Sequence, residues 1–324
     1  MLRTFTILLF FILFGFQSFG QQRALKKANE HFKNDEFAEA MPLYEEVLAQ
    51  TDSRMAKTKL AYCYKMNNLL PEAESLYAEL VTDEHSPAIT MFYYGEALMS
   101  NEKYDEAKQW FEKFLDEQPD SKNAPLLIKA CEEVQNIVPY FENIRIEEFS
   151  QNSTADDNGP VFWMDKIVFT SDRNAGLKLL QKKSGTTGRD FLKLYASSPT
   201  PEGDWSEPEA LDKLNEVNKN TTNAAFDTVA NKVYFTKNAN TLNKQNTYNL
   251  QLYAASFDDN GSFKNVEKLA FCNIGSNYMH PAVSPDGKKL FYVADRSNGE
   301  GGTDIYVSEN EIEWRMGTWK KPWT

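Results

Sequence analysis

The sequence predicts a multidomain α plus β protein, in which an N-terminal α-solenoid is followed by an incomplete β-propeller of about three blades. Two internal repeats carry this prediction. In the N-terminal part a small residue recurs at Ala40, Ala73 and Ala107, at intervals of 33 and 34 residues, within a helical pattern. In the C-terminal part three strand-and-turn landmarks recur in the same order, which is typical of blades made of short strands.

The first twenty residues differ in kind from the rest of the chain. Arg3 supplies a positive charge, Leu8–Phe16 is an apolar run, and Ser18 and Gly20 are small residues at the end of the segment. This pattern is typical of a secretory signal peptide, so residues 1–20 are predicted to be removed by cleavage after Gly20. The alternative is an N-terminal membrane anchor, for which the apolar run is short.

Composition and motifs disfavour several classes of function. The formal net charge of −12 disfavours nucleic acid and anionic membrane surfaces, because both attract basic proteins. The three histidines show no metal-ligand spacing, and no Gly-x-Ser-x-Gly elbow occurs. We therefore predict no catalytic residue, no metal site and no cofactor. Cys63 and Cys131 fall on helical patterns and Cys272 on a strand pattern. All three are interpreted as small buried apolar residues, with a Cys63–Cys131 disulfide as the alternative.

The helical repeat pairs small residues with large aromatic ones. The matching positions are Ala28, Ala61 and Gly95 in the first helices, and Ala40, Ala73 and Ala107 followed by Tyr44, Tyr77 and Phe111 in the second helices. Small residues let paired helices approach closely, and the aromatic ring fills the gap between them. These residues resemble the tetratricopeptide repeat (TPR) family, whose period is 34 residues. The resemblance implies a TPR domain over residues 21–140, with three repeats from Arg23 to about Ser121 and a capping helix at Ala124–Val138.

The resemblance to TPR proteins places the candidate binding surface on an inner groove, lined by the first helix of each pair. By repeat alignment the exposed groove positions are Asn29, Lys33, Tyr62, Lys65, Met66, Phe92, Glu96 and Met99. Asn29 and Lys33 match two positions of the carboxylate clamp by which some TPR proteins hold C-terminal peptides, whereas Leu25 replaces the first lysine of that clamp. The aromatic and methionine side chains predict an apolar groove for a helix or an extended segment. The alternative is that these side chains pack against neighbouring helices.

Met279–Ser308 is the clearest of the three strand-and-turn units. His280–Val283 and Asp304–Val307 are predicted strands, and Ser284–Gly287 is a Ser-Pro-Asp-Gly turn, in which proline and glycine suit the backbone angles. Leu290–Val293 is an apolar run without alternation, so both of its faces are predicted to be buried. A blade that lies between two neighbours has this property.

The same unit occurs twice upstream. Asp165–Arg173 and Asn231–Lys237 match the central strand, and an aromatic landmark recurs at Trp205, Phe263 and Trp319. Ahead of these units, Asn143–Phe149 alternates apolar residues with charges and is predicted to be a strand. The domain boundary is placed near 139–142, after Pro139, and residues 141–324 are predicted to form the partial propeller.

These units resemble the WD40-like Pro-Asp-Gly propeller repeats of TolB-type envelope proteins, through Ser284–Lys289 and Gly301–Val307. The order signal peptide, TPR, propeller resembles Bacteroidetes envelope proteins with a C-terminal OmpA-like peptidoglycan-binding domain, some of which serve type IX secretion and gliding. The resemblance implies an exported, periplasmic or outer-membrane-associated scaffold without enzymatic activity, whose partners are envelope proteins. Because the smallest usual propeller has four blades, we expect the chain to be truncated relative to this family, without the residues that bind peptidoglycan.

Two other functions stay open at this point. The propeller would fit a truncated prolyl-oligopeptidase-type hydrolase, which needs a downstream α/β-hydrolase domain, or a sensor of glycans or peptides. The pairs Asp172-Arg173 and Asp295-Arg296 recur at equivalent places, and we interpret them as a repeated ion pair or turn contact, since a catalytic site need not repeat. The pairs Asp156-Asp157 and Asp258-Asp259 lack the spacing of a calcium loop and are interpreted as solvated turns.

Overall fold

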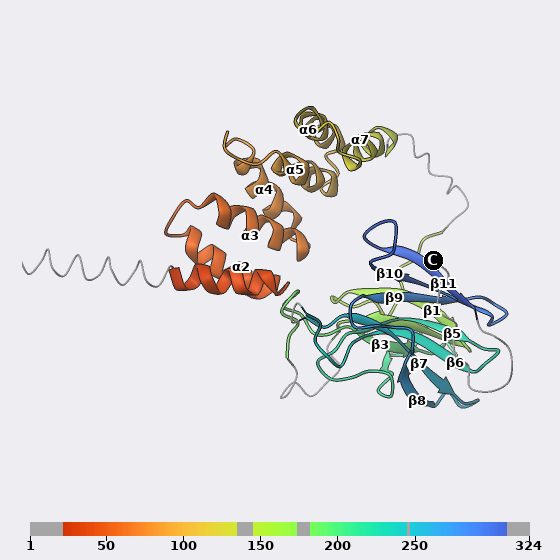
Figure 1. Ribbon diagram of the computed structural model, residues 1–324. Helices are drawn as coiled ribbons and strands as arrows, with labels where there is room; N and C mark the ends of the chain where they lie inside the picture. The colour runs from red at the N-terminus through yellow and green to blue at the C-terminus, as the bar shows by residue number, and fades with distance from the viewer. Residues whose placement is uncertain (1–21, 135–144, 174–181, 245–246, 310–324) are drawn as a thin grey trace, which may run out of the picture. The chain divides into compact units, whose positions relative to one another are not determined.

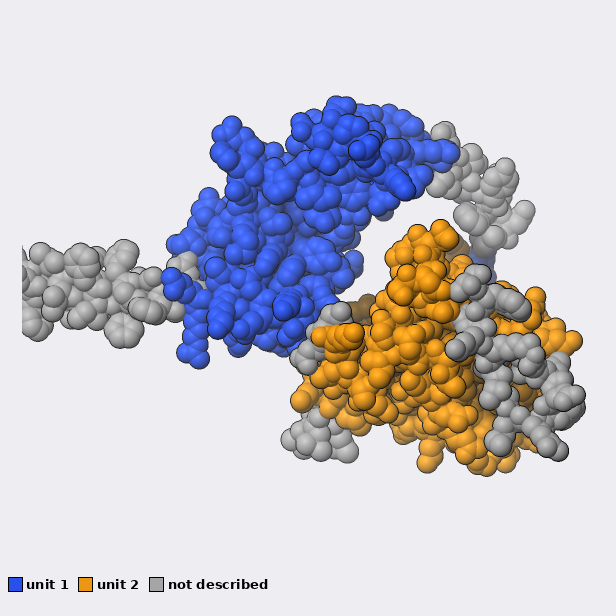
Figure 2. Space-filling model, in the orientation of Figure 1, with its two compact units in different colours: residues 1–145, 185–188 blue, residues 146–184, 189–324 orange. Residues whose placement is uncertain are grey.

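The computed structural model describes residues 22–134, 145–173, 182–244 and 247–309 (Figure 1). The chain forms two compact units (Figure 2): residues 1–145 with 185–188, and residues 146–184 with 189–324. The first unit is helical and the second consists of β-strands. The predicted signal peptide, the predicted boundary near 139–142 and the landmark at Trp319 lie outside the described residues.

The helical unit contains seven helices within its described part, and each packs against the next one along the chain. The first spans residues 22–33, and the others are α2 (Phe37–Leu48), α3 (Arg54–Met66), α4 (Leu70–Leu80), α5 (Ile89–Ser100), α6 (Tyr104–Glu117) and α7 (Asn123–Glu133). Three helix pairs and a final helix are therefore present, which confirms the predicted solenoid. The predicted capping helix corresponds to α7, and residues 135–138 of that prediction fall outside the described part.

The packing between the paired helices explains why small residues recur. All of the small positions predicted from the repeat are buried, as are Tyr44, Tyr77 and Phe111. At Gly95 the approach is closest, because a Cβ atom there would lie 2.6 Å from the ring of Phe111. The third repeat thus requires glycine where the first two have alanine.

The described residues of the β unit form three antiparallel sheets, and within each sheet the strands follow the order of the chain. The first sheet contains β1 (Asp157–Trp163), β2 (Lys166–Ser171), β3 (Lys193–Ser197) and β4 (Glu209–Ala210); the second contains β5 (Thr221–Asp227), β6 (Lys232–Asn238), β7 (Leu250–Phe257) and β8 (Phe263–Lys268); the third contains β9 (Tyr278–Val283), β10 (Lys289–Ala294) and β11 (Asp304–Glu309). The predicted turn at Ser284–Gly287 is present, with Gly287 at φ 68° donating to the Ser284 carbonyl. The described strands form no closed barrel, so the propeller is not confirmed.

Consecutive sheets pack face to face. Strand β5 contacts β1, β2 and β3 of the first sheet, and β9 contacts β5, β6 and β7 of the second. One apolar core lies between the first two sheets and includes Val168, Leu194 and Phe235. A second core lies between the second and third sheets and includes Leu252 and Tyr292. Burial of these apolar faces is what holds the sheets together.

A repeated set of hydrogen bonds also joins the sheets. An asparagine lies just before the first strand of the second sheet and just before that of the third sheet. Asn220 Oδ1 accepts a bond from the backbone NH of Leu192, next to β3 of the first sheet, at 2.9 Å. Asn277 Oδ1 accepts one from the backbone NH of Leu250, in β7 of the second sheet, at 2.8 Å. A backbone NH of the first strand also donates to a threonine hydroxyl of the preceding sheet. The NH of Asn223 donates to Thr170 Oγ1, and the NH of His280 donates to Thr236 Oγ1, both at 3.1 Å. The same relation therefore holds from the first sheet to the second and from the second to the third.

Three expectations from the sequence need correction. Residues 145–149 form no strand: Ile146 is 85% exposed, and Phe149 packs against Phe169 and Trp205. The run Leu290–Val293 is buried on one face only, since Phe291 on the other face is 40% exposed. Cys272 lies in the connection after β8, not in a strand.

Candidate functional site

The predicted groove residues of the helical unit form what we call the inner face: Asn29 and Lys33 on residues 22–33, Tyr62, Lys65 and Met66 on α3, and Phe92, Glu96 and Met99 on α5. Asn29 joins three helices, because its Oδ1 accepts bonds from Lys59 Nζ of α3 at 2.6 Å and from Tyr44 Oη of α2 at 2.9 Å. Further along, Lys65 Nζ of α3 pairs with Glu96 Oε2 of α5 at 2.5 Å. The Lys59–Asn29 and Lys65–Glu96 contacts each tie the first helix of one repeat to the first helix of the next, and the Tyr44–Asn29 bond joins the two helices of the first repeat.

The larger apolar residues of the inner face contribute to contacts between helices. Tyr62 is half-buried, with its ring centroid 5.6 Å from that of Phe32 and 5.4 Å from that of Phe37. Phe92 is also half-buried and packs on Phe111 and Phe114. Met99 packs beside the core of the third repeat. These three side chains follow the alternative that the sequence left open, in which they pack against neighbouring helices.

Lys33 and Met66 are the exposed members of the predicted set, and the Met66 side chain is 43% exposed. Lys33 also lines a hollow along the first helix, together with Gln22, Leu25, Lys26, Asn29 and Glu30. The inner face thus exposes an amine at Lys33 and a flexible thioether at Met66. Methionine suits such a surface because its unbranched chain adapts to different shapes.

Lys59 belongs to the inner face but was not in the predicted set. Besides its bond to Asn29, its Nζ lies 5.1 Å from the centre of the Phe32 ring. The signal that would find it is the repeat itself, because Lys26, Lys59 and Tyr93 occupy equivalent positions at intervals of 33 and 34 residues. Lys65 Nζ similarly lies 5.7 Å from the ring of Tyr93.

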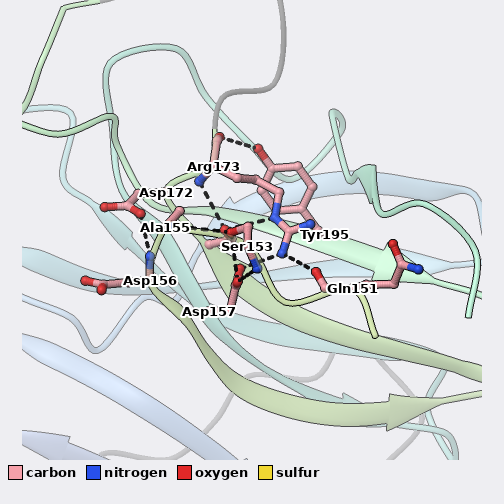
Figure 3. A network of polar contacts seen from close by, with 9 residues as sticks. Gln151, Ser153, Ala155, Asp156, Asp157, Asp172, Arg173 and Tyr195 are labelled. Atoms are coloured by element: carbon pink, nitrogen blue, oxygen red, sulfur yellow. Dashed lines mark hydrogen bonds and ion pairs between the residues drawn. The ribbon is translucent and has the colours of Figure 1, made fainter. Parts of the chain in front are cut away.

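A polar network lies at one end of the first sheet of the β unit (Figure 3). Arg173 Nη2 binds Asp157 Oδ1 at 2.6 Å and the Gln151 carbonyl at 2.9 Å, and the guanidinium lies 5.5 Å from the centre of the Tyr195 ring. Asp172 accepts the backbone NH of Asp156 at 2.9 Å. The polar groups in this network are bonded to one another, which holds the end of the first sheet in place.

The recurrence of Asp-Arg pairs has a structural cause. In each sheet the last residue of the second strand, or the residue just after it, accepts a bond from the backbone NH just before the first strand. Asp172 accepts from Asp156, Asn238 from Asn220, and Asp295 from Asn277. Arg173 and Arg296 each lie over the tyrosine of the third strand, at 5.5 Å from Tyr195 and 5.1 Å from Tyr306. The turn contact predicted from the sequence is therefore confirmed.

Burial changes the acidity of several groups in the first sheet. Burial raises the pKa of Asp172, and the negative charges of Asp190 and Asp157 add to this effect. Burial also acts to raise the pKa of Asp157, but hydrogen bonds from Arg173, Ser171 and Ser153 outweigh it and hold the pKa below its usual value. Burial lowers the pKa of Lys193 to about 8.

A cavity of about 300 Å³ opens beside this network, and Lys193 lies on its wall. Its lining carries charges of both signs, from Arg173, Lys182 and Lys193 and from Asp190, Asp212 and Glu216, with Tyr195 and Val217 among the others. The Lys193 amine donates to the backbone carbonyls of Glu216 and of Lys219. The cavity is large enough for a small polar ligand.

The three cysteines are free and buried, so the interpretation of small buried residues is confirmed over the alternative disulfide. Among the described residues, histidine, cysteine and acidic side chains form no group of three that could hold a metal ion. A search of those same parts of the chain finds no helix with the length and apolar character needed to span a membrane.

The comparisons with known proteins concern mainly the helical unit. A family model described as tetratricopeptide repeat matches residues 25–89 and 72–122. The first TPR of Spaghetti (RPAP3), solved with the HSP90 peptide SRMEEVD, is 24% identical over 36% of this chain and 95% of its own, with a TM-score of 0.33. The TPR-containing C-terminal domain of a Plasmodium falciparum FK506-binding protein is 20% identical over 37% of this chain and 91% of its own, with a TM-score of 0.31.

For a larger part of the chain the similarity is lower. A thermostable family-43 glycoside hydrolase is 15% identical over 52% of this chain and 57% of its own, with a TM-score of 0.30. No curated protein matches the sequence. The family model and the helix pairs together show that the N-terminal unit consists of TPR repeats, which are a protein–protein interaction module.

Proposed function

We propose that this chain is a non-enzymatic scaffold of the cell envelope, whose TPR repeats bind a segment of another envelope protein. The observation that carries the proposal is the inner face, where Asn29–Lys59 and Lys65–Glu96 link successive first helices and leave Met66 exposed. A stack held in this way presents a preformed surface, which reduces the entropy lost when a partner binds. The export signal expected at the N-terminus supports an envelope location.

The chemistry of the inner face defines the segment that would bind. Met66 would contact an apolar side chain, and the exposed Lys33 amine would pair with a carboxylate. The Lys65 amine is already paired with Glu96, and Lys59 is bonded to Asn29, so these two lysines position helices instead of supplying free charge. The proposed partner segment is therefore amphipathic with an acidic group beside its apolar anchor.

The β unit is proposed to be part of a propeller that presents a second interaction surface. Its three consecutive antiparallel sheets, related by the same inter-sheet hydrogen bonds at Asn220 and Asn277, support this assignment. A role in a type IX-like secretion or gliding assembly, or in a peptidoglycan-associated one, is part of the same proposal and rests on the resemblance of the domain order.

Site-specific photo-crosslinking in the native cell tests this function. A photoreactive amino acid replaces Met66, and the matched control replaces Leu126 of α7, which is 66% exposed and lies outside the inner face. We expect crosslinks from position 66 to one or a few envelope proteins, and loss of these crosslinks in the Lys33→Glu variant. Crosslinks to cytoplasmic proteins, or the same products from positions 66 and 126, would contradict the proposal.

A second candidate function is the binding of a small ligand by the β unit, which the 300 Å³ cavity beside Lys193 favours. Val217 lines this cavity and is 62% exposed, so Val217→Trp would fill it, while Val229→Trp is a control at a similarly exposed position outside the lining. Native mass spectrometry of the chain purified from its own cells is expected to show a bound small molecule that Val217→Trp alone removes. A spectrum of bare protein would refute this function.

A further inference from the structure

The third sheet of the β unit has one covered face and one open face. In the register of β10 and β11, Leu290 lies opposite Ser308 and Tyr292 opposite Tyr306, and all four side chains are buried. The alternate pairs lie on the other face: Phe291 opposite Val307, and Val293 opposite Ile305. On this open face Phe291 is 40% exposed and Ile305 is 78% exposed.

The equivalent positions in the other two sheets are covered. Val168 and Tyr234 correspond to Phe291, and they are 0% and 1% exposed. Leu194 and Leu252 correspond to Ile305, and they are 1% and 0% exposed. In both earlier sheets the next sheet along the chain packs on these residues. Within the described ranges no sheet does so for the third one, although its residues have the same apolar character.

We propose that the open face of β9–β11 is a self-association surface, on which two copies of this chain pair sheet to sheet around a two-fold axis. Apolar sheet faces pack on one another at about 10 Å, and each sheet of this unit already uses that contact with its neighbour. A two-fold axis gives an isologous contact, in which the same patch serves both copies and the assembly closes at two. This inference does not depend on the proposed function of the TPR repeats.

A head-to-tail contact is the other geometry to consider. It would place the first sheet of one copy on the open face of another, as the second sheet lies on the first. The residues that the first sheet would then use are Phe169 and Tyr195, by equivalence with Tyr292 and Tyr306. They are already covered, because Phe149 packs on Phe169 at 5.8 Å and Arg173 lies over both rings. The two-fold contact leaves these interactions intact.

Charge also favours pairing of identical faces. The chain has a net charge of −12, so a contact between two copies adds the least further repulsion where the contacting surface is itself neutral. The open face ends in the register pair Lys289 and Glu309, with Nζ 3.9 Å from Oε1 and both side chains about half exposed. This register pair therefore adds no net charge to the open face, and a two-fold axis parallel to the strands brings the lysine of one copy toward the glutamate of the other.

Sedimentation velocity of the full chain over a range of concentrations tests the proposal. We expect a monomer–dimer equilibrium, and Ile305→Lys should weaken the dimer at least about tenfold, since the two-fold axis places two like charges in an apolar contact. Val229→Lys is the matched control, because Val229 is 68% exposed in the turn after β5. Circular dichroism confirms that both variants fold.

A second measurement guards against misfolding of the lysine variant. Ile305→Cys should form an intermolecular disulfide on mild oxidation, whereas Val229→Cys should not, and the three natural cysteines are buried and do not compete. A chain that stays monomeric at every concentration would overturn the proposal, because another protein or residues 310–324 would then cover the face. Equal effects of the Ile305 and Val229 substitutions, or assemblies that grow beyond two copies, would overturn it as well.

Discussion

Tyr44 and Tyr77 occupy the same position in the first and second TPR repeats, but their hydroxyl groups have different surroundings. Both side chains are fully buried. The Tyr44 hydroxyl donates to Asn29 Oδ1 at 2.9 Å, whereas the Tyr77 hydroxyl has no hydrogen-bond partner among the described residues. Phe111 holds the equivalent position of the third repeat, so a ring without a hydroxyl fits the same site.

This difference predicts opposite effects for the same chemical change. A buried hydroxyl without a partner costs about 1–3 kcal/mol, so Tyr77→Phe should raise the free energy of unfolding of the helical unit by about 1 kcal/mol. Tyr44→Phe removes a satisfied hydrogen bond, and it should lower the free energy of unfolding by about 0.5–1.5 kcal/mol. The two variants should therefore differ by about 2 kcal/mol.

Urea unfolding of the full chain measures both variants, with far-ultraviolet circular dichroism to follow the helices. We expect the midpoint of the helical transition to move up for Tyr77→Phe and down for Tyr44→Phe, with an unchanged slope. If Tyr77→Phe lowers the midpoint as much as Tyr44→Phe does, the Tyr77 hydroxyl has a partner, and the reasoning from the buried unpaired group fails.

Three further predictions concern the β unit. The Lys193 amine, whose pKa burial lowers to about 8, should become reactive toward acylating reagents near pH 8, about two pH units before exposed lysines, and competitive labelling with mass spectrometry measures this. Leu252→Ala should cost about 2–5 kcal/mol, whereas Ile305→Ala at the equivalent exposed position should change the free energy of unfolding of the monomer by less than about 0.5 kcal/mol. Equal costs in urea unfolding at a protein concentration too low for dimers would contradict the burial argument. Asp157→Asn should cost about 1–3 kcal/mol at pH 7. Because the folded-state pKa of Asp157 is lowered, its stabilisation is present above pH 3.8 and disappears as the pH falls through the folded-state value, so the variant and the natural chain should converge in acid.

The solenoid could be predicted from the sequence because its repeat is carried by side-chain size. Ala61, Gly95 and the buried aromatic residues must recur wherever helices approach closely, and spacing alone reveals them. The Ser-Pro-Asp-Gly turn is similarly local, because Gly287 at φ 68° needs the freedom of glycine. Sheets of consecutive antiparallel strands follow from the same kind of short-range pattern.

Other features depend on contacts that spacing does not encode. The sequence of Leu290–Val293 resembles a strand buried on both faces. Phe291 is nevertheless exposed, because no sheet among the described residues packs on its face of the strand. Residues 145–149 alternate like a strand, but they belong to none of the strands of the described structure. The repeat spacing would place Lys59 on the inner face, but it does not reveal the bond from Lys59 to Asn29 on another helix, at a separation of 30 residues.

The hydrogen bonds between sheets have a consequence for how the β unit forms. Asn220 reaches back 28 residues to Leu192, and Asn277 reaches back 27 residues to Leu250, while every strand pairs with its neighbours in the chain. Such a topology has a low contact order for a β protein, because no contact of this kind waits for distant segments to meet. We expect the sheets to fold in succession, each one serving as the template for the next, and to fold faster than a β-sandwich of the same length.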